Sequence, residues 1–210
     1  MILVIPPELV GQYRPQLEEM HRLRYRVFKE RMDWDVNVQN GLEFDVYDTL
    51  APTYFLALDD TGTVVGTWRL LPTTGPNMLR DTFADLLEGK AAPCHDDVWE
   101  TSRFAVEAPD NPDGRTMVST ITRELFCGLV EYCLMQGIDE VVTVYDIRIA
   151  RLLPQIGCDP RWQTARKRIG NTIALAGGFE ISEAVLSGIR TAGNITQSVL
   201  VNLAALRRAA

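Results

Sequence analysis

Residues 54–58 (YFLAL) and 64–71 (VVGTWRLL) form two apolar runs that are joined by a short polar stretch beginning at 59–62 (DDTG). Runs of this length that are rich in β-branched and aromatic residues predict β-strands. A short turn with Gly62 between two such runs predicts an antiparallel hairpin. We therefore expect antiparallel strands at the centre of the fold.

On the N-terminal side of the hairpin, residues 2–5 predict a short strand that ends at Pro6-Pro7. Pro15 is placed to begin a helix, and apolar residues recur at helical spacing from Leu17 to Met32. Residues 34–48 show no clear period and predict an irregular segment.

On the C-terminal side, helices and strands follow one another. The predicted helices span residues 78–87, 116–136, 147–153, 181–191 and, in the tail, 194–210. The predicted strands span residues 98–106, 141–145, 162–167 and 172–179, and a loop is predicted at 108–114. This order predicts an α+β fold, with a mixed, mostly antiparallel sheet and helices on both faces. Because no repeat, linker or low-complexity stretch interrupts the order, we expect residues 1–210 to form a single domain.

The composition excludes several classes of protein. A net charge of −7 leaves no basic excess for binding nucleic acid. No signal-peptide pattern and no apolar run of about 20 residues is present, so we expect a cytoplasmic protein without a membrane span. Cys94, Cys127, Cys133 and Cys158 lack metal-ligand spacing, and only two histidines accompany them. We expect buried, reduced cysteines and no metal site.

Charged side chains occur within segments that otherwise have the pattern of a protein core. The notable positions in the first half are Arg24, Phe28, Trp34, Glu43, Asp45, Asp48, Arg69, Phe83, Glu100 and Arg103. Buried charges must be paired, so these residues form either a structural ion-pair network or a functional site. By itself, the spacing of Glu43, Asp45 and Asp48 would also fit a solvated loop or a weak divalent-cation site.

These ten residues, together with residues 99–106 (WETSRFAV), resemble the acyl-homoserine-lactone synthases, the LuxI-type autoinducer synthases of bacterial quorum sensing. The resemblance implies an acyltransferase with the fold of the N-acetyltransferases (GNAT-like). It implies synthesis of an N-acyl-L-homoserine lactone from S-adenosylmethionine and an acyl thioester, with release of methylthioadenosine. The acyl donor would be an acyl carrier protein or coenzyme A, and no cofactor is expected because S-adenosylmethionine is a substrate.

The resemblance also implies roles for individual residues. Those expected to bind S-adenosylmethionine are Arg24, Phe28, Trp34, Asp45, Asp48 and Arg103. The α-amine of this substrate has a reference pKa of about 7.7–8.0, so it needs a base near neutral pH. Glu100 is the first candidate for that base and Glu43 the second. Arg69 and Arg103 complete the expected catalytic set, although Arg69 could orient a carboxylate or only stabilise the sheet.

The acyl side of the site is less constrained by the sequence. The expected pocket residues are Phe83, Ser102, Val142, Thr143 and Val144, and other apolar walls are expected from Leu125, Leu129, Leu152 and Leu175. Thr143 resembles a hydroxyl position that accompanies 3-oxo-acyl preference in some family members. Backbone N–H groups of residues 103–106 are candidates for stabilising the thioester oxyanion. A carrier-docking patch is expected from Arg148, Arg151, Arg166 and Lys167, although these residues would equally fit a solvated face.

Three other functions remain as alternatives. An ordinary GNAT-type N-acyltransferase would use acyl-CoA on another amine, but residues 108–115 (APDNPDGR) lack the glycine pattern that binds pyrophosphate. A catalytically silent binding module on the same fold would not need the complete set of charged residues. A methyltransferase would need a glycine-rich strand–turn–helix near the N-terminus, and none is present.

Overall fold

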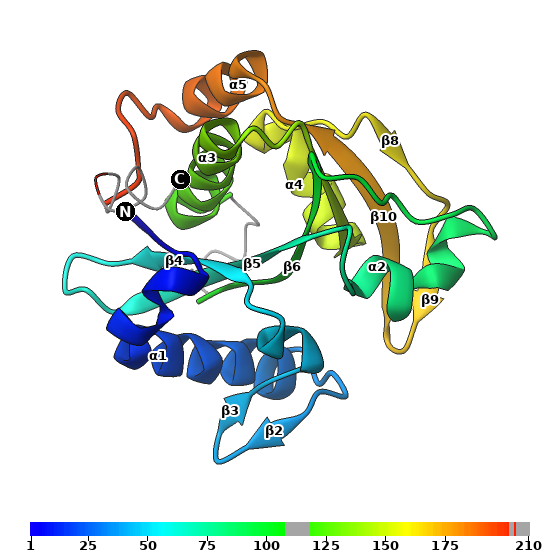
Figure 1. Ribbon diagram of the computed structural model, residues 1–210, viewed down its shortest axis with the longest axis horizontal. Coiled ribbons are helices and arrows are strands. Elements are labelled where there is room, and N and C mark those ends of the chain that lie inside the picture. Colours follow the sequence, from blue (N-terminus) through cyan, green and yellow to red (C-terminus); the bar gives the residue numbers. More distant parts are fainter. Residues whose placement is uncertain (108–117, 202–203, 205–210) are drawn as a thin grey trace.

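The computed structural model describes residues 1–107, 118–201 and 204. A single large sheet runs through this part of the chain (Figure 1). Its strands, in spatial order, are β1 (Ile2–Ile5), β4 (Thr53–Leu58), β5 (Val64–Pro72), β6 (Val98–Val106), β7 (Glu140–Asp146), β10 (Thr172–Glu180) and β8 (Trp162–Gln163), and β9 (Lys167–Ile169) also pairs with β10. Neighbouring strands are antiparallel except for β6 and β7, which are parallel. The predicted fold class and the β4–β5 hairpin are confirmed.

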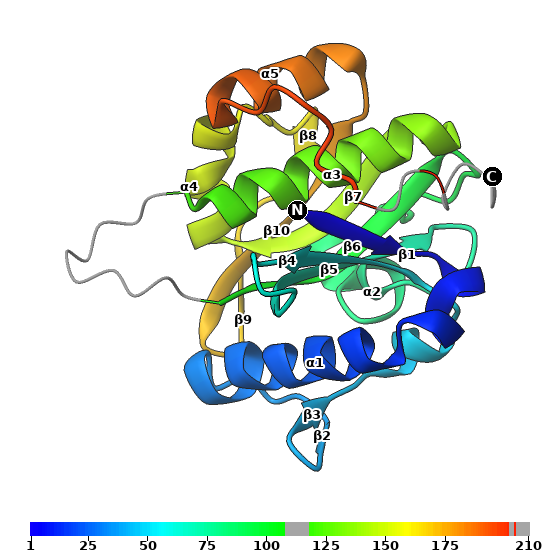
Figure 2. The same cartoon turned by 90° about the vertical axis from the view of Figure 1, so that its left-hand side faces the viewer.

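Helices cover both faces of the sheet (Figure 2). One face carries α1 (Arg14–Arg24), which continues as a π-helical segment η2 (Tyr25–Arg31). The other face carries α3 (Thr120–Gln136), α4 (Ile147–Ile156) and α5 (Glu183–Gly193). Shorter elements complete the chain: η1 (Pro7–Gln12), β2 (Val38–Gln39), β3 (Leu42–Glu43), η3 (Val46–Thr49), α2 (Met78–Asp81) and η4 (Ala84–Leu87).

Side chains of the strands alternate between the two layers, as the period of two in a β-strand requires. In β4, Phe55 and Ala57 belong to the core under α3, whereas Tyr54 and Leu56 belong to the core above α1. In β5, Trp68 and Leu70 face α3 in the same way. The intervening Arg69 consequently points into the α1 layer, where the other predicted charges lie.

Strand β6 contains a bulge at Arg103, whose φ of 59° lies in the left-handed region. The pairing with β5 shifts there, because Arg69 is opposite Ser102 whereas Thr67 is opposite Ala105. The ladder between β6 and β7 is limited to Val98–Thr101 on the β6 side. A bulge bends the strand that carries it, and beyond Thr101 the two parallel strands separate. This opening positions the site described below.

Several predicted elements differ in the structure. The helix predicted at 78–87 is divided into α2 and η4, and the strand predicted at 162–167 is two short strands, β8 and β9. Between these strands, the hydroxyl of Thr164 accepts a hydrogen bond from the N–H of Ala176 in place of a backbone carbonyl. The irregular segment at 34–48 contains the small β2–β3 hairpin. Helix α3 begins at Thr120 because Ser119 caps it, and the loop predicted at 108–114 lies outside the described residues.

The predicted tail helix is wrong over residues 195–201. Asn194 ends α5 in a left-handed conformation, and Leu200 then pairs with Ile2 at the edge of the sheet. Residues 202, 203 and 205–210 lie outside the described part of the chain.

Cys94 is exposed, contrary to expectation, whereas the other three cysteines are buried and free. No described helix is long and apolar enough to cross a membrane.

Candidate active site

Six of the predicted charged residues meet in a closed ring of alternating charge within the α1 layer. Going round the ring, each residue pairs with the next: Arg24, Glu43, Arg103, Asp45, Arg69, Asp48 and back to Arg24. The Arg103 to Glu43 distance is 3.0 Å, Arg103 to Asp45 is 2.8 Å, and Arg69 to Asp48 is 2.9 Å. Each carboxylate therefore contacts two guanidinium groups, which is how one buried and two partly buried acids lie close together without net repulsion.

Local structure fixes the acidic half of the ring. Asp45 caps η3 by accepting from the backbone N–H groups of Tyr47 and Asp48, and Asp48 accepts in return from the N–H of Asp45. Arg24 donates to Asp48 through both terminal nitrogens, at 2.8 and 2.9 Å. Burial alone would raise the pKa of Asp48, but Arg24 and Arg69 outweigh it and hold this pKa well below its usual range. Asp48 is thus ionised throughout the neutral pH range.

Glu43 is fully buried, and its two carboxylate oxygens are bound by Arg24 and Arg103. It does not line the cavity described below. Both carboxylate oxygens of Glu43 are therefore engaged by guanidinium groups, and its side chain lies outside the cavity wall. Its geometry is that of a structural member of the ring, which weakens its candidacy as the base.

Glu100 is placed differently, on β6 beside the ring but outside it. Its carboxylate accepts hydrogen bonds from the backbone N–H groups of Met78 (2.8 Å) and Leu79 (2.5 Å), at the start of α2. Burial raises the pKa of Glu100 to about 7, although these two N–H groups and Arg69 oppose the rise. Glu100 also lines the cavity. A buried carboxyl with a pKa near neutrality is suited to accepting a proton at physiological pH.

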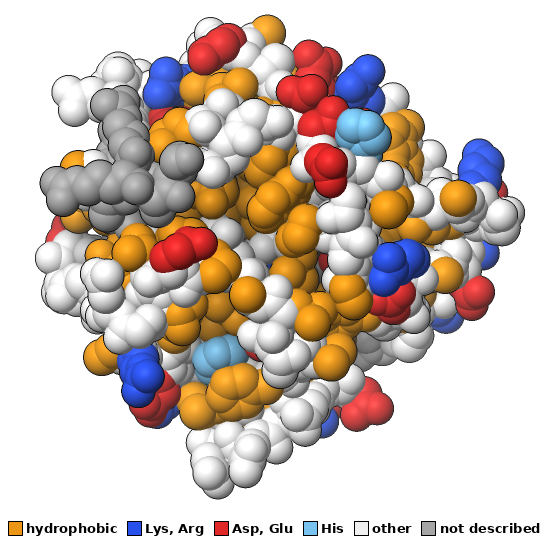
Figure 3. Space-filling model, in the orientation of Figure 1, with side chains coloured by type: hydrophobic (Ala, Val, Ile, Leu, Met, Phe, Trp, Pro, Cys, Tyr) orange, Lys and Arg blue, Asp and Glu red, His pale blue; other side chains and the backbone are white. Residues whose placement is uncertain are grey.

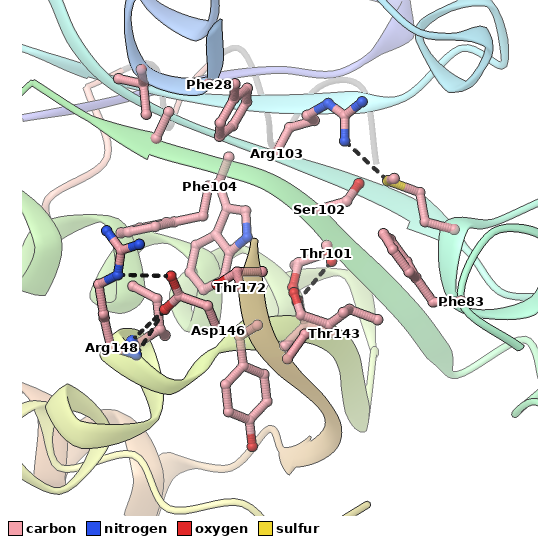
Figure 4. Close-up of a pocket in the computed structure, with 18 of the residues that line it drawn as sticks. Phe28, Phe83, Thr101, Ser102, Arg103, Phe104, Thr143, Asp146, Arg148 and Thr172 are labelled. Atoms are coloured by element: carbon pink, nitrogen blue, oxygen red, sulfur yellow. Dashed lines mark hydrogen bonds and ion pairs between the residues drawn. The ribbon is translucent and has the colours of Figure 1, made fainter. Parts of the chain in front are cut away.

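A cavity of about 810 Å³ passes between the separated strands β6 and β7. From the α1 layer it is lined by Phe28, Trp34 and Met78, and from the α3 layer by Phe126 and Leu129. Figure 4 shows Phe28, Arg103 and Ser102 near one end, with Thr143 and Asp146 across the opening. On the face seen in Figure 3, hydrophobic side chains gather around a hollow near the middle of the molecule. The cavity therefore connects the charged ring with the apolar core.

Aromatic residues form the wall next to the ring. Phe28 and Trp34 are stacked, with ring centroids 5.2 Å apart and planes inclined by 3°. The guanidinium carbon of Arg103 lies 5.6 Å from the centroid of Phe28. This platform offers π faces to a positively charged ligand.

Most of the predicted pocket residues line the cavity, namely Phe83, Ser102, Thr143, Val144 and Leu129. Val142 does not, because its side chain packs in the α2 layer against Leu79 and Leu86. Leu125, Leu152 and Leu175 are also absent from the walls. The hydroxyl of Thr143 donates to the carbonyl of Thr101 at 2.9 Å.

The four predicted docking residues lie on two separate parts of the chain. Arg148 and Arg151 belong to α4, and Arg148 lines the cavity and pairs with Asp146 at 3.4 Å. Arg166 is exposed, and the ammonium of Lys167 donates to the carbonyl of Asp85. No contact recorded among the described residues joins the two pairs.

Sequence reasoning missed Asn77, which is buried and caps α2 at the point where Glu100 is bound. An Asn directly before a helix is an N-cap signal that could have identified it. It also missed Thr101 and Trp68, which line the cavity with buried polar atoms. Their pattern is that of ordinary strand residues.

Comparison with known proteins assigns this arrangement to a family. The model of the autoinducer synthases matches residues 8–189. The chain belongs to the autoinducer synthase family. An acyl-homoserine-lactone synthase of Agrobacterium fabrum is 38% identical over 210 residues, covering 100% of this chain and 99% of the relative. Another from Pseudomonas aeruginosa is 41% identical over 168 residues, covering 79% of this chain and 83% of the relative.

Solved structures agree with this assignment. The crystal structure of the AHL synthase LasI matches with a TM-score of 0.78 and 36% identity, covering 91% of this chain and 94% of that one. The CoA-dependent synthase BjaI, solved with SAM and isopentyl-CoA, matches with a TM-score of 0.82 and 28% identity, covering 100% and 98%. A putative N-acetyltransferase from Lactobacillus plantarum shares the fold at 14% identity, with a TM-score of 0.54. This autoinducer synthase is therefore an acyltransferase of the acyl-homoserine-lactone synthase class on a GNAT-like fold.

Proposed function

We propose that this autoinducer synthase joins S-adenosylmethionine to an acyl thioester, forms an N-acyl-L-homoserine lactone and releases methylthioadenosine. The observation that carries the proposal is the position of Glu100. It lies where the cavity meets the charged ring, beside the bulge at Arg103 and with a pKa of about 7. Glu100 can thus act as proton acceptor at the point where the polar end of the cavity, beside the ring, meets its apolar end.

In the first step, the α-amine of S-adenosylmethionine attacks the thioester carbon. Glu100 takes a proton from the amine, the C–S bond breaks, and the thiol leaves after it is protonated. The carbonyl oxygen carries negative charge in the transition state, and the backbone around the Arg103 bulge is the candidate for stabilising it. The raised pKa of Glu100 suits this role because the carboxylate can both accept and return a proton near neutral pH.

In the second step, a carboxylate oxygen of the acylated intermediate attacks the carbon attached to the sulfonium. That carbon–sulfur bond breaks, and methylthioadenosine leaves with the electron pair. The sulfonium is a cation, and the stacked Phe28 and Trp34 offer it a π face. Arg103, the member of the ring that also lies against Phe28, is the candidate for binding the substrate carboxylate.

The relatives support both substrates. BjaI was solved with SAM and isopentyl-CoA, and TofI with an inhibitor and MTA. For this chain the donor is either an acyl carrier protein or coenzyme A. Arg148 and Arg151 on α4 are the candidates for binding an acidic carrier, since Arg148 also lines the cavity.

The test is to incubate the purified protein with S-adenosylmethionine and acyl thioesters on both carriers, and to measure lactone and methylthioadenosine by mass spectrometry. Glu100→Gln should lower turnover at least about tenfold. Glu140→Gln is the matched control, because Glu140 is also a strand carboxylate but binds Trp162 away from the cavity. Acylation of a different amine, or no methylthioadenosine with any donor, would contradict the proposal.

A further inference from the structure

A methionine sulfur lies between the charged ring and the cavity. Met78 is the first residue of α2, is 7% exposed and lines the cavity. Its Sδ accepts hydrogen bonds from Nη2 of Arg69 at 3.4 Å and from Nη1 of Arg103 at 3.5 Å. The dashed line from Arg103 to a sulfur atom in Figure 4 marks the second contact. Two arginines of the ring therefore direct a donor at one thioether.

The same two arginines use other donors for the carboxylates of the ring. Arg103 binds Glu43 through Nε and Asp45 through Nη2. Arg69 binds Asp45 through both terminal nitrogens. A thioether sulfur is a weak acceptor, so the N–H groups directed at Met78 make weaker hydrogen bonds than those directed at the carboxylates. A stronger acceptor at the position of the sulfur would therefore hold both arginines more tightly.

The side chain of methionine can become such an acceptor by oxidation. Hydrogen peroxide transfers one oxygen atom to the sulfur: the S–O bond forms while the O–O bond breaks, and the rest of the peroxide leaves as water. The sulfur is oxidised by two electrons, and these reduce the peroxide. The product is a sulfoxide, which is polar where the thioether was apolar. Peroxide is small enough to enter a cavity of about 810 Å³.

Resting on the proposed function, we infer that Met78 is a modification site, at which oxidation by hydrogen peroxide inhibits the enzyme. The sulfoxide oxygen is attached to Sδ, which already lies within 3.5 Å of both guanidinium groups. It then holds a donor of Arg103, the candidate for binding the carboxylate of S-adenosylmethionine. Glu100 is bound by backbone N–H groups and not by the sulfur, so the proton acceptor stays in place. Oxidation therefore weakens substrate binding rather than the chemical step.

The position of Met78 sets it apart from the other methionines that the structure describes. Met20 is fully buried in the core above α1, and Met1 is exposed at the N-terminus. Met32 also lines the cavity, but it packs against the α1 core. Among the described methionines, Met78 thus combines access from the cavity with contact to the ring, and Met32 supplies a matched control.

The experiment treats the native enzyme, Met78→Leu and Met32→Leu with hydrogen peroxide, removes the peroxide with catalase and compares each protein with its own untreated sample. In the native enzyme, the KM for S-adenosylmethionine should rise at least about tenfold, as expected for losing one hydrogen bond to a charged group. The kcat at saturating substrate should stay within about twofold. Leucine keeps the volume of methionine without the sulfur, so Met78→Leu should resist peroxide, whereas Met32→Leu should be as sensitive as the native enzyme.

Peptide mass spectrometry of the same samples measures the oxygen gained at Met78, independently of turnover. S-adenosylmethionine should slow oxidation at Met78 but not at the exposed Met1. Dithiothreitol after the treatment reduces disulfides and sulfenic acids but not a sulfoxide, so it should not restore the KM if Met78 rather than a cysteine is responsible.

Full oxidation at Met78 with an unchanged KM would overturn the inference. So would equal inhibition of Met78→Leu and the native enzyme, or an unoxidised Met78 in a protein whose Met1 is fully oxidised. Failure of the proposed function is distinguishable, because the untreated enzyme would then release no methylthioadenosine with any thioester, whereas oxidation and its prevention by S-adenosylmethionine are measured on the protein itself.

Discussion

Arg24 is a fully buried arginine of the charged ring. It lies at the end of α1 and pairs with both Glu43 and Asp48. Burial by itself would lower the pKa of its guanidinium, but Asp48 and Glu43 outweigh that effect and raise it, so Arg24 stays charged. The ring of three arginines and three carboxylates is neutral overall, which allows it to remain in the core.

We predict that Arg24→Ala lowers the free energy of unfolding by about 3–5 kcal/mol, because it leaves two buried carboxylates with one cation each. Urea unfolding followed by circular dichroism measures the change. Arg22→Ala is the control, since the exposed Arg22 pairs with Glu18 one turn away. Its loss should cost less than about 1 kcal/mol. Equal stability of the two variants would show that the ring contributes nothing to folding.

Glu100 makes a separate prediction about pH. Its pKa is about 7 when folded, because burial raises it, and near 4.3 when unfolded. Between these values the folded state holds a proton that the unfolded state has lost. The Glu100 contribution is therefore fully present below about pH 4, falls as pH rises through this window and is lost above about pH 7.

The measurement is the free energy of unfolding of the native protein and of Glu100→Gln at several pH values from 5 to 8.5. The native protein should lose on the order of 3 kcal/mol relative to the variant across the window. The readout is how the difference in unfolding free energy between the two proteins changes with pH. A constant part of that difference is expected, because the Gln side chain can accept only one of the two N–H hydrogen bonds. A constant difference would mean that Glu100 titrates near its ordinary pKa.

For individual residues, the sequence predicted which charged side chains form the cluster but not which of them pair with one another. Charges at core positions required pairing, and Arg24, Arg69 and Arg103 do pair with the three predicted acids. The order of the ring depends on how α1, η3, β5 and β6 meet, which no local pattern specifies. The two glutamates differ in their partners for the same reason. Glu100 binds the two backbone N–H groups at the start of α2, and the sequence near Glu100 does not specify that contact.

Among the elements, α2 has the most direct link to the proposed chemistry. Asn77 accepts from the N–H of Arg80 and donates to the carbonyls of Thr73 and Gly75. It thereby fixes the turn that presents the N–H groups of Met78 and Leu79 to Glu100. Asn77 is a positioning residue, because it acts on Glu100 through the backbone.

We predict that Asn77→Ala weakens these two N–H contacts and raises the pKa of Glu100 further, since hydrogen bonds to the charged form lower a carboxyl pKa. The rise in kcat/KM with pH should move toward higher pH by about half a unit to one unit, and stability should fall by about 1 kcal/mol. Asn194→Ala is the control, because Asn194 ends α5 far from Glu100. A lower kcat/KM at every pH with no shift of the profile would leave Asn77 a purely structural cap.

Element boundaries were predictable where one local signal dominated. Gly137 ends α3 and Gly157 ends α4 in left-handed conformations, as glycine after a helix suggests. The bulge at Arg103 was not predictable, because an arginine carries no local preference for positive φ. The backbone is held there by its pairing with β5 and by the ion pairs of Arg103 with Glu43 and Asp45. The helix predicted for the tail is wrong because Leu200 pairs with Ile2, at the other end of the sequence. No local pattern specifies such a contact.

For the whole molecule, the cavity links the two layers that the sheet would otherwise separate. The α1 layer supplies the ring and Glu100, and the α3 layer supplies apolar walls such as Phe126 and Leu129. Because β6 and β7 separate after Thr101, a long acyl chain can pass from one layer into the other. Chain length should then be set by side chains of α3 rather than by residues near the ring.

Leu129→Ala tests this division. Removing the side chain lengthens the cavity on the α3 side, so longer acyl chains should gain relative to shorter ones. Two more buried methylene groups are worth about 1.6 kcal/mol, so the kcat/KM ratio for donors differing by two carbons should rise by up to about fifteenfold. Leu125→Ala is the matched control, because Leu125 is equally buried on α3 but does not line the cavity. Both variants should lose about 2–5 kcal/mol of stability, yet only Leu129→Ala should change the ratio of kcat/KM values. A similar change in both variants would show that chain-length preference depends on how tightly the core packs rather than on the cavity wall.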